Sequence, residues 1–246
     1  MRPIMVPTPL LRFLQRLDVR QHHRATRRAF DGWQYCANLP GGTECLGWMA
    51  RLCWDKKVPF VIGDVENGFP GCKISEILEA MEAVLPCMLP SFLRWCERGY
   101  RAYGTGGALV DHVVGGMPQG DPCVPIFFGA FMVHKMQQTS EAVRATTAAG
   151  EAQAAPSAYA DDGGIFGHGA LAWRRQWKGT FSVKDNQYVD AGRSWEQCRQ
   201  LIREQDLDPD EYRITCADWS DDWTDEQKAQ ARRGGATELP RREIPW

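Results

Sequence analysis

One segment, residues 156–167, constrains the fold of this chain more than any other. It reads PSAYADDGGIFG, with small and apolar residues on both sides of Asp-Asp-Gly-Gly. This pattern predicts a strand, a tight turn and a second strand, with Asp-Asp-Gly-Gly at the turn. Adjacent carboxylates repel each other and are costly to bury, so Asp161 and Asp162 need solvent or a cation beside them. The segment alone leaves two interpretations open, a plain polar turn and a cation site.

Apolar segments of two kinds accompany this hairpin. VPFVIGDV (58–65) is rich in β-forming residues and predicts a buried strand. Residues 74–85 and 89–100 repeat apolar side chains with the period of a helix. Residues 122–136 are apolar nearly all round and begin with proline, which predicts a buried helix. Helices and strands therefore both contribute to the expected core.

The composition changes after residue 169, so we expect a core over residues 1–169 and a different segment over 170–246. The second segment holds six of the ten tryptophans and many charges of both signs. Within it, residues 178–190 are consistent with a hairpin, and two residue pairs have the spacing of capping boxes that open short helices: Ser194 with Gln197, and Thr224 with Gln227. Before it, the alanine-rich residues 139–156 predict a weak helix end or a flexible connector.

Positive charge is concentrated at the start of the chain, although the formal net charge is only −2. Residues 1–30 hold seven arginines against one acid, Asp18. A basic segment of this kind can lie along a phosphate backbone. It can equally be a solvated helix face on which arginine stems cover apolar surface. The candidate nucleic-acid contacts are Arg12, Arg16, Arg20, Arg24, Arg27 and Arg28.

Two further features bear on the cellular compartment. No apolar run is long enough to span a bilayer, and the first residues lack the pattern of a signal peptide. The nine cysteines form no C-x-x-C pair, which argues against a zinc ribbon or knuckle and fits a reducing compartment. We therefore expect an intracellular protein, in the nucleus or the cytoplasm, with no membrane partner.

Three features that can carry chemistry stand in a fixed order. Asp64 ends the strand predicted at 58–65, the block GGMPQGDP (115–122) leads into the buried helix, and Asp161 with Asp162 lies at the hairpin. Magnesium takes hard oxygen ligands and often uses one or two carboxylates together with substrate phosphates. Asp64 on a neighbouring strand can complete such a site with Asp161. Two metals about 3.5–4 Å apart would support an in-line phosphoryl transfer.

The order of these motifs resembles the palm of reverse transcriptases. The matching residues are Asp64 with Phe69, GMPQGDP (116–122) and YADD (159–162), and the opening Arg2-Pro3-Ile4 resembles the fingers motif that precedes them. The form Q-G-D-P-x-x-P and the run DVENGF are most similar to enzymes of non-long-terminal-repeat retroelements (retrotransposons). The resemblance covers residues 1–169. It implies an α+β fold, a palm with an antiparallel sheet and a catalytic hairpin backed by helices, with partial fingers.

The resemblance assigns the carboxylates to catalysis. It implies that Asp64, Asp161 and Asp162 are the catalytic residues. It also implies that Asp64, Val65 and Asp161 bind two Mg²⁺ ions, which Mn²⁺ can replace.

The resemblance further implies contacts to the incoming nucleotide by Arg2, Phe69, Gln119 and Gly120. Arg2 would grip the triphosphate, a task that suits the fork of a guanidinium. Gln119 and Gly120 match the loop that lies against template and nucleotide. Phe69 matches the residue packed under the sugar, where a ring leaves no room for a 2′-hydroxyl. This predicts selection of deoxynucleotides.

The implied function is that of an RNA-directed DNA polymerase, a nucleotidyltransferase that adds deoxynucleotides to a primer 3′-hydroxyl. Its partners would be an RNA template, a DNA primer and deoxynucleoside triphosphates, and the oligomeric state is not implied. An alternative palm polymerase that copies RNA into RNA would tend to carry a polar residue near position 69 and glycine at position 160. Phe69 and Ala160 stand there instead, which favours DNA synthesis.

The sequence departs from the family pattern after YADD. The lysine-bearing palm motif is not evident, and Lys178 and Lys184 are the nearest candidates. Gly68 stands where the family usually has alanine, and no thumb, endonuclease or RNase H signature is evident. The first part of the fingers also has no counterpart in the sequence. A catalytically inactive, retroelement-derived relic that binds nucleic acid therefore stays open as an alternative.

Overall fold

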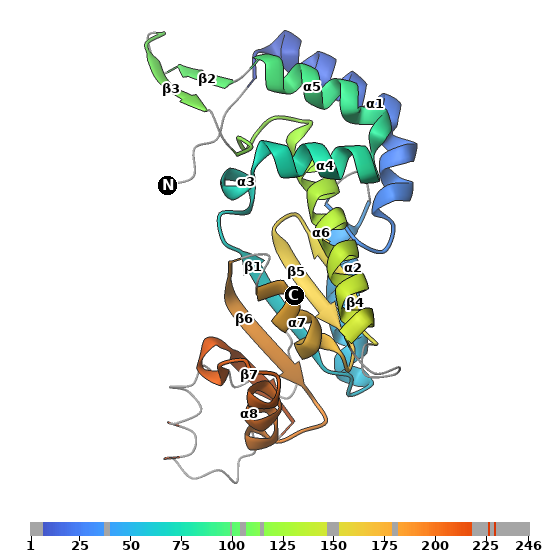
Figure 1. Cartoon of the computed structure of the whole chain (residues 1–246), viewed down its shortest axis with the longest axis vertical. Helices are drawn as coiled ribbons and strands as arrows, with labels where there is room; N and C mark the ends of the chain where they lie inside the picture. The colour runs from blue at the N-terminus through green and yellow to red at the C-terminus, as the bar shows by residue number, and fades with distance from the viewer. Residues whose placement is uncertain are drawn as a thin grey trace. The chain divides into compact units, whose positions relative to one another are not determined.

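The structure is a computed structural model that describes residues 7–36, 40–98, 100–103, 107–113, 116–146, 153–178 and 182–217, with Glu226 and Ala229. The chain divides into two compact units, which we describe separately (Figure 1). Unit 1 comprises Met1–Pro40 and Asn67–Gln137, and unit 2 comprises Gly41–Glu66 and Gln138–Trp246. The expected boundary at residue 169 does not coincide with this division.

Unit 1 is mainly helical. Its elements are α1 (Pro9–Phe30), α3 (Gly68–Gly71), α4 (Ile74–Val84), the 3-10 turn η1 (Pro86–Met88), α5 (Leu89–Arg98), the hairpin of β2 (Tyr100–Tyr103) with β3 (Leu109–Val113), and the first part of α6 (Val124–Thr146). The helix predicted at 74–85 is confirmed, and the helix predicted at 89–100 is confirmed as far as Arg98, whereas Tyr100 belongs to β2. The buried helix predicted at 122–136 is also confirmed as α6, which continues to Thr146. Of the two possibilities left open for residues 139–156, the first part is therefore a helix end.

The core of unit 1 is built on α4, α5 and α6. Ile77 and Met81, one turn apart on α4, are fully buried, as the helical period predicts. Phe92 of α5 meets Phe127 of α6 edge to face, with ring centroids 5.1 Å apart. Such a pair adds stability beyond the burial of its area.

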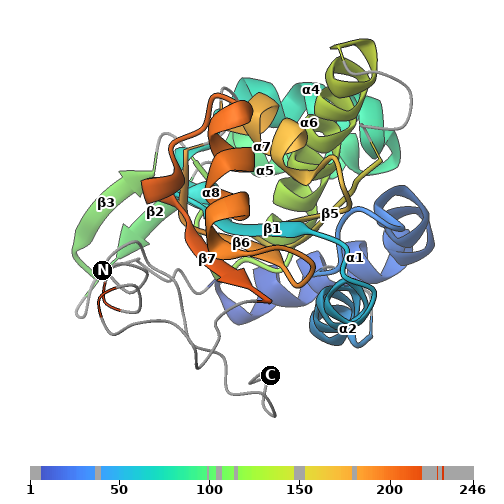
Figure 2. The same ribbon diagram turned by 90° about the horizontal axis from the view of Figure 1, so that it is seen from below.

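A five-stranded sheet organises unit 2 (Figures 1 and 2). Its strands are β1 (Phe60–Val65), β4 (Ala155–Tyr159), β5 (Asp162–Phe166), β6 (Val183–Asp190) and β7 (Arg213–Cys216), in the order β4-β5-β1-β6-β7. All neighbours pair antiparallel except β6 and β7, which are parallel. The parallel pair is a departure from the antiparallel sheet that we expected. The predicted strand at 58–65 and the predicted hairpin at 156–167 are both present.

Two local predictions need correction. The hairpin turn is formed by Ala160 and Asp161, whereas Asp162 and the two glycines already belong to β5. Ala160 takes a left-handed conformation, φ +55°, to close this short turn. Residues 183–190 form the single strand β6 instead of a hairpin, because their partners are the distant strands β1 and β7.

The helices of unit 2 cover both faces of its sheet. The helices of unit 2 are α2 (Gly42–Asp55), the last part of α6, α7 (Ala170–Lys178), α8 (Trp195–Glu204) and the 3-10 turn η2 (Pro209–Glu211). Phe60, Phe166 and Val189 form a core with apolar residues of α2 on one face. Val61 and Ile165 face Trp177 of α7 on the other face. Because side chains alternate along a strand, Asp64 lies on the same face as Phe60.

Two further predictions concern the C-terminal segment and the membrane. The capping box of Ser194 with Gln197 is confirmed at the start of α8, with both reciprocal hydrogen bonds present. The pair Thr224 and Gln227 lies outside the described residues. In the part of the chain that the structure describes, no helix has the length and apolar character needed to cross a membrane.

Candidate active site

The expected catalytic carboxylates meet at one end of the sheet in unit 2. Asp64 on β1 lies directly opposite Asp162 on β5. Asp161 occupies the adjoining turn, and its carbonyl oxygen accepts a hydrogen bond of 2.9 Å from the amide of Val65. Cross-strand partners share a face of the sheet, so the side chains of Asp64 and Asp162 lie on the same face. We call Asp64, Val65, Asp161 and Asp162 the strand-end cluster.

The sequence assigns metal binding to Asp161 and a supporting role to Asp162, and both roles stay predictions. The register places Asp162, which is exposed, directly across from Asp64, while Asp161 is half-buried in the turn. Two like charges directly opposite each other destabilise a sheet. The cluster therefore needs a compensating positive charge.

Lys184 supplies a positive charge beside the cluster. It lies on β6 as the cross-strand partner of Asp64, and its Nζ is 3.1 Å from Asp64 Oδ2. The Asp64 side chain is 22% exposed and that of Lys184 is 45% exposed, so the pair is only partly sheltered. The sequence left Lys184 as one of two candidate lysines. Its place depends on the pairing of distant strands, which no local pattern reveals.

The strand-end cluster contains some of the oxygen ligands that a hard divalent cation needs. Carboxylate and carbonyl oxygens are the ligands that Mg²⁺ prefers. The Asp64 carboxylate already attracts a cation in this structure, the ammonium of Lys184. Among the described residues, no group of three His, Cys, Asp or Glu side chains is placed to hold an ion. A metal site here would therefore rest on one or two carboxylates completed by substrate phosphates, as many magnesium sites do.

The GMPQGDP loop lies in unit 1, where it is held against the segment that carries Phe69. The amide of Met117 donates to the carbonyl oxygen of Phe69 at 2.8 Å. Gly116 has φ +70°, and a Cβ atom there would stand 2.2 Å from the carbonyl oxygen of Pro70. Only glycine permits this approach of the two backbones. The Gly-Met-Pro part of the motif therefore has a packing role.

Asp121 of the same loop is buried, and both of its carboxylate oxygens accept hydrogen bonds. It is 2% exposed, and its carboxylate accepts hydrogen bonds from Gln15 Nε2 of α1, from Trp95 Nε1 at 3.3 Å and from the amide of Cys123 at 2.7 Å. Burial raises the pKa of Asp121, and these hydrogen bonds oppose that rise. Asp121 thus ties α1, α5 and the start of α6 together. Sequence reasoning did not single it out.

The residues expected to contact the nucleotide have different surroundings. The Phe69 ring is 7% exposed and stacks on Phe128 of α6, with centroids 4.2 Å apart. Gln119 is half-buried and Gly120 is exposed, with φ +111°. Arg2 lies outside the described residues. Phe69, Gln119 and Gly120 belong to unit 1, whereas the strand-end cluster belongs to unit 2.

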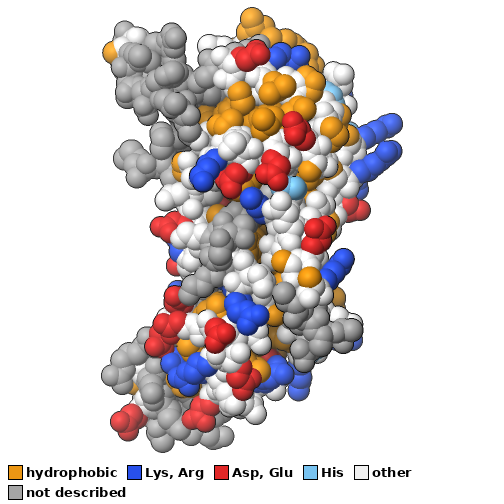
Figure 3. Space-filling view, viewed as in Figure 1, with side chains coloured by type: hydrophobic (Ala, Val, Ile, Leu, Met, Phe, Trp, Pro, Cys, Tyr) orange, Lys and Arg blue, Asp and Glu red, His pale blue; other side chains and the backbone are white. Residues whose placement is uncertain are grey.

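The basic segment forms helix α1 of unit 1. The six candidate arginines are all exposed: Arg12, Arg16, Arg20, Arg24, Arg27 and Arg28. Basic side chains stand out from the edge where Figure 1 draws α1 (Figure 3). No described carboxylate forms an ion pair with any of the six, and Asp18 instead pairs with His22 at 3.4 Å. Four large apolar side chains of α1 are also exposed, namely Leu10, Phe13, Leu14 and Leu17.

Comparison with known proteins gives a likeness of fold. No protein-family model and no curated protein match the sequence. Among solved structures, the chain is similar to apo telomerase from Candida tropicalis truncated from its C-terminal domain, with a TM-score of 0.51 and 8% identity. The match covers 75% of this chain and 41% of that one. At this identity the likeness concerns the fold alone. At a coarse level, then, this mixed fold of a five-stranded sheet and helices is similar to that of telomerase.

Proposed function

We propose that this chain is the palm and partial fingers of a reverse transcriptase derived from a non-long-terminal-repeat retroelement. Its activity would be the transfer of deoxynucleotides to a primer 3′-hydroxyl on an RNA template. The observation that supports this most is the strand-end cluster. Sequence motifs far apart, Asp64 and YADD, converge at one end of one sheet with Lys184 beside them.

The residues of the strand-end cluster would act by holding divalent cations next to the substrate. When bound there, a pair of divalent cations would lower the pKa of the attacking hydroxyl and neutralise charge on the phosphates. Asp64 and Asp161 would hold the cations, with the Val65 carbonyl oxygen as a further ligand. Asp162 would add negative charge on the same face. Most of the rate would come from positioning and electrostatics and little from covalent chemistry by side chains.

The residues of unit 1 would contribute binding and selection. Gln119 and Gly120 would contact template and nucleotide, Arg2 would bind the triphosphate, and Phe69 would exclude the 2′-hydroxyl. These roles rest on the resemblance of the motifs. The buried Asp121 network supports them indirectly, because it fixes the loop that carries Gln119 and Gly120 to three helices.

Primer extension tests this proposal. The purified chain is given an RNA template, a DNA primer, deoxynucleotides and Mg²⁺ or Mn²⁺, and is compared with Asp161→Ala. We expect extension by the natural sequence and none by the variant. Asp206→Ala is a matched control, because Asp206 is an exposed aspartate of unit 2 outside the strand-end cluster. Equal extension by all three proteins would reject the metal site.

A second candidate function is nucleic-acid binding without catalysis, and helix α1 favours it. Six exposed arginines without a described carboxylate partner suit contacts to phosphates. Replacing Arg16, Arg20 and Arg24 by alanine should weaken RNA binding and reduce the slope of log affinity against log salt by about 2. The control replaces three exposed arginines of unit 2, Arg175, Arg203 and Arg213. RNA binding that needs α1, together with no extension under any condition, would favour this alternative.

A further inference from the structure

The pairing between β1 and β6 contains a register shift next to Asp64. Phe60, Val61 and Ile62 face Val189, Tyr188 and Gln187 in regular antiparallel order. Beyond Ile62, the register shifts, and Asp64 faces Lys184. One residue of β1, Gly63, therefore spans the same length as Asp185 and Asn186 of β6. Asp185 adopts a left-handed conformation with φ +51°, as one residue of a β-bulge can.

This bulge decides which charge faces Asp64. If the regular register continued past Ile62, Asp185 would stand opposite Asp64, and Lys184 would stand opposite Val65. Asp64 would then have a carboxylate on each neighbouring strand, because Asp162 already faces it from β5. The bulge instead brings the ammonium of Lys184 to 3.1 Å from Asp64 Oδ2. One extra residue thus replaces a repulsive cross-strand pair with an attractive one.

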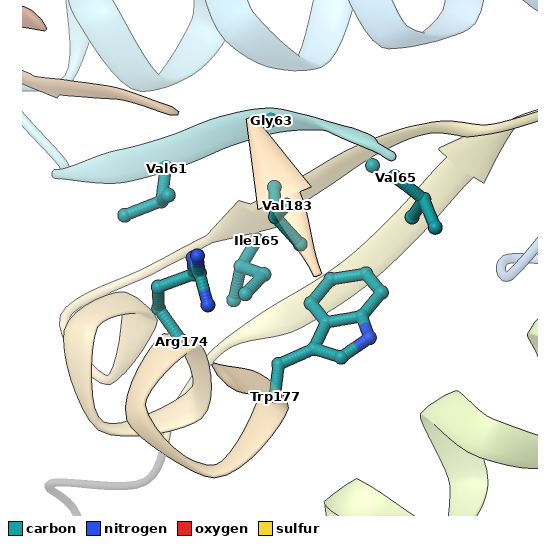
Figure 4. A pocket seen from close by; sticks show the side chains of 8 residues that line it. Val61, Gly63, Val65, Ile165, Arg174, Trp177 and Val183 are labelled. Carbon is teal, nitrogen blue, oxygen red and sulfur yellow. The ribbon is translucent and has the colours of Figure 1, made fainter. Parts of the chain in front are cut away.

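A buried pair of side chains holds the bulge from the opposite face. Arg174 of α7 is 3% exposed, and its Nε donates to Asn186 Oδ1 at 2.9 Å. Asn186 in turn donates to the carbonyl oxygen of Val183 at 3.4 Å. Figure 4 shows Arg174 reaching from its helix toward the strands, beside Ile165 and Val183. A guanidinium is costly to bury without a strong reason. Here its hydrogen bond fixes the residue that follows Asp185.

Strand β1, which lies opposite the bulge, carries a glycine where a side chain would clash with β6. A Cβ atom on Gly63 would stand 2.5 Å from Val183 Cγ1 and 3.2 Å from Asn186 Oδ1. Any larger residue would therefore force Val183 to move next to the bulge. Gly63, Asn186 and Arg174 together form a built arrangement, which we call the bulge clamp. The clamp lies on the face of the sheet opposite to the strand-end cluster.

We propose that Lys184, presented by the bulge clamp, is a built-in counter-ion of Asp64 that a divalent cation must displace. This inference rests on the proposed function, since it assumes that Asp64 binds metal. Lys184 neutralises the carboxylates of the strand-end cluster while no metal is bound. A cation that arrives with substrate phosphates then displaces the ammonium from Asp64. Lys184 therefore acts as a positioning residue that lowers the affinity for free metal.

Binding of Mn²⁺ to the whole chain without substrate tests this, with free Mn²⁺ measured by electron paramagnetic resonance. Lys184→Met removes the charge but keeps the length of the side chain. We expect it to bind Mn²⁺ about fivefold more tightly, the effect of losing a partly exposed ion pair. Lys184→Arg keeps the charge and should stay within about twofold of the natural affinity. Asp64→Asn should lose this binding.

Two outcomes separate the inference from the function on which it rests. Equal affinity of Lys184→Met and the natural sequence, with binding lost in Asp64→Asn, would overturn the counter-ion role and leave the metal site intact. Undiminished binding by Asp64→Asn would reject the metal site itself, and the counter-ion role with it. The clamp has its own readout, because Arg174→Met should shift Mn²⁺ affinity in the same direction as Lys184→Met. An unchanged affinity in folded Arg174→Met would show that the clamp does not position Lys184.

Discussion

Two aspartates, one in each unit, belong to neighbouring motifs of the same resemblance and have opposite surroundings. Asp121 in unit 1 is 2% exposed and accepts hydrogen bonds from a glutamine, a tryptophan and a backbone amide. Asp64 in unit 2 is 22% exposed, faces the carboxylate of Asp162 and lies beside the ammonium of Lys184. The first is surrounded by neutral donors, and the second by charges of both signs.

This difference distinguishes a carboxylate with a structural role from a carboxylate that is suited to binding a metal ion. Neutral donors satisfy the oxygens of Asp121, so that it can join helices without any ion. At Asp64 the negative charge of two strands is only partly compensated, by a lysine that remains half-exposed. A carboxylate in such surroundings can exchange one cation for another.

Replacing Asp64 by asparagine should impair activity, whereas replacing Asp121 by asparagine should impair stability. Asp64→Asn should reduce primer extension about a thousandfold, since several kcal/mol of charge stabilisation are lost. It should change the free energy of unfolding by less than about 1 kcal/mol, because the ion pair is partly exposed. Asp121→Asn should cost about 1–3 kcal/mol of stability, because a buried donor loses its acceptor. Urea unfolding measures the change in stability, and primer extension measures the change in activity. A large loss of stability in Asp64→Asn with full activity, or a loss of activity in Asp121→Asn with full stability, would contradict these roles.

The second prediction concerns sugar selection in unit 1. Phe69→Val should raise incorporation of ribonucleotides relative to deoxynucleotides by about tenfold or more, because the ring is lost from the position implied to lie under the sugar. Phe128→Leu is the matched control, since Phe128 stacks on Phe69 and the change disturbs the same packing. The control should lower stability without altering sugar selection. Unchanged selection in Phe69→Val would favour the RNA-copying alternative.

The third prediction uses the pH dependence of stability. Burial raises the pKa of Asp121 above its usual 3.8, so protonation favours the folded state. The stability that this group contributes is fully present below the unfolded pKa and is lost as the pH rises through the folded pKa. The stability advantage of the natural sequence over Asp121→Asn should therefore be largest at acid pH and shrink toward neutrality. Urea unfolding at several pH values measures it, and an advantage that grows with pH would contradict the assignment.

The smallest expected effect is local to unit 2. Ser194→Ala removes the hydroxyl that accepts from the amide of Gln197 at the start of α8. Loss of such a cap should cost about 1 kcal/mol in the free energy of unfolding. Ser75→Ala, at an exposed position inside α4, should stay within about 0.5 kcal/mol. If Ser194→Ala and Ser75→Ala changed the free energy of unfolding equally, the cap would not be stabilising α8.

Local patterns predicted several of the elements but not the partners of their residues. The helix α4 and the hairpin of β4 and β5 follow from periods of 3.6 and 2 that the sequence displays directly. The strand β6 could not be identified, because its residues alternate poorly and its partners β1 and β7 are distant in the sequence. For the same reason the sequence could not choose between Lys184 and Lys178 as the site lysine. The motif resemblance named Asp64 and Asp161, but it could not show that the bulge places the ammonium of Lys184 3.1 Å from Asp64 Oδ2.

The most direct measurement is a crystal structure of the chain grown with Mn²⁺, an RNA template, a DNA primer and a deoxynucleoside triphosphate, with anomalous scattering recorded to locate the metal. We expect a peak within coordination distance of Asp64 and of Asp161 or Asp162, with the Lys184 ammonium moved away from Asp64 Oδ2. No peak at the strand-end cluster, with Lys184 still on Asp64 at saturating Mn²⁺, would contradict the proposed metal site and the polymerase function built on it.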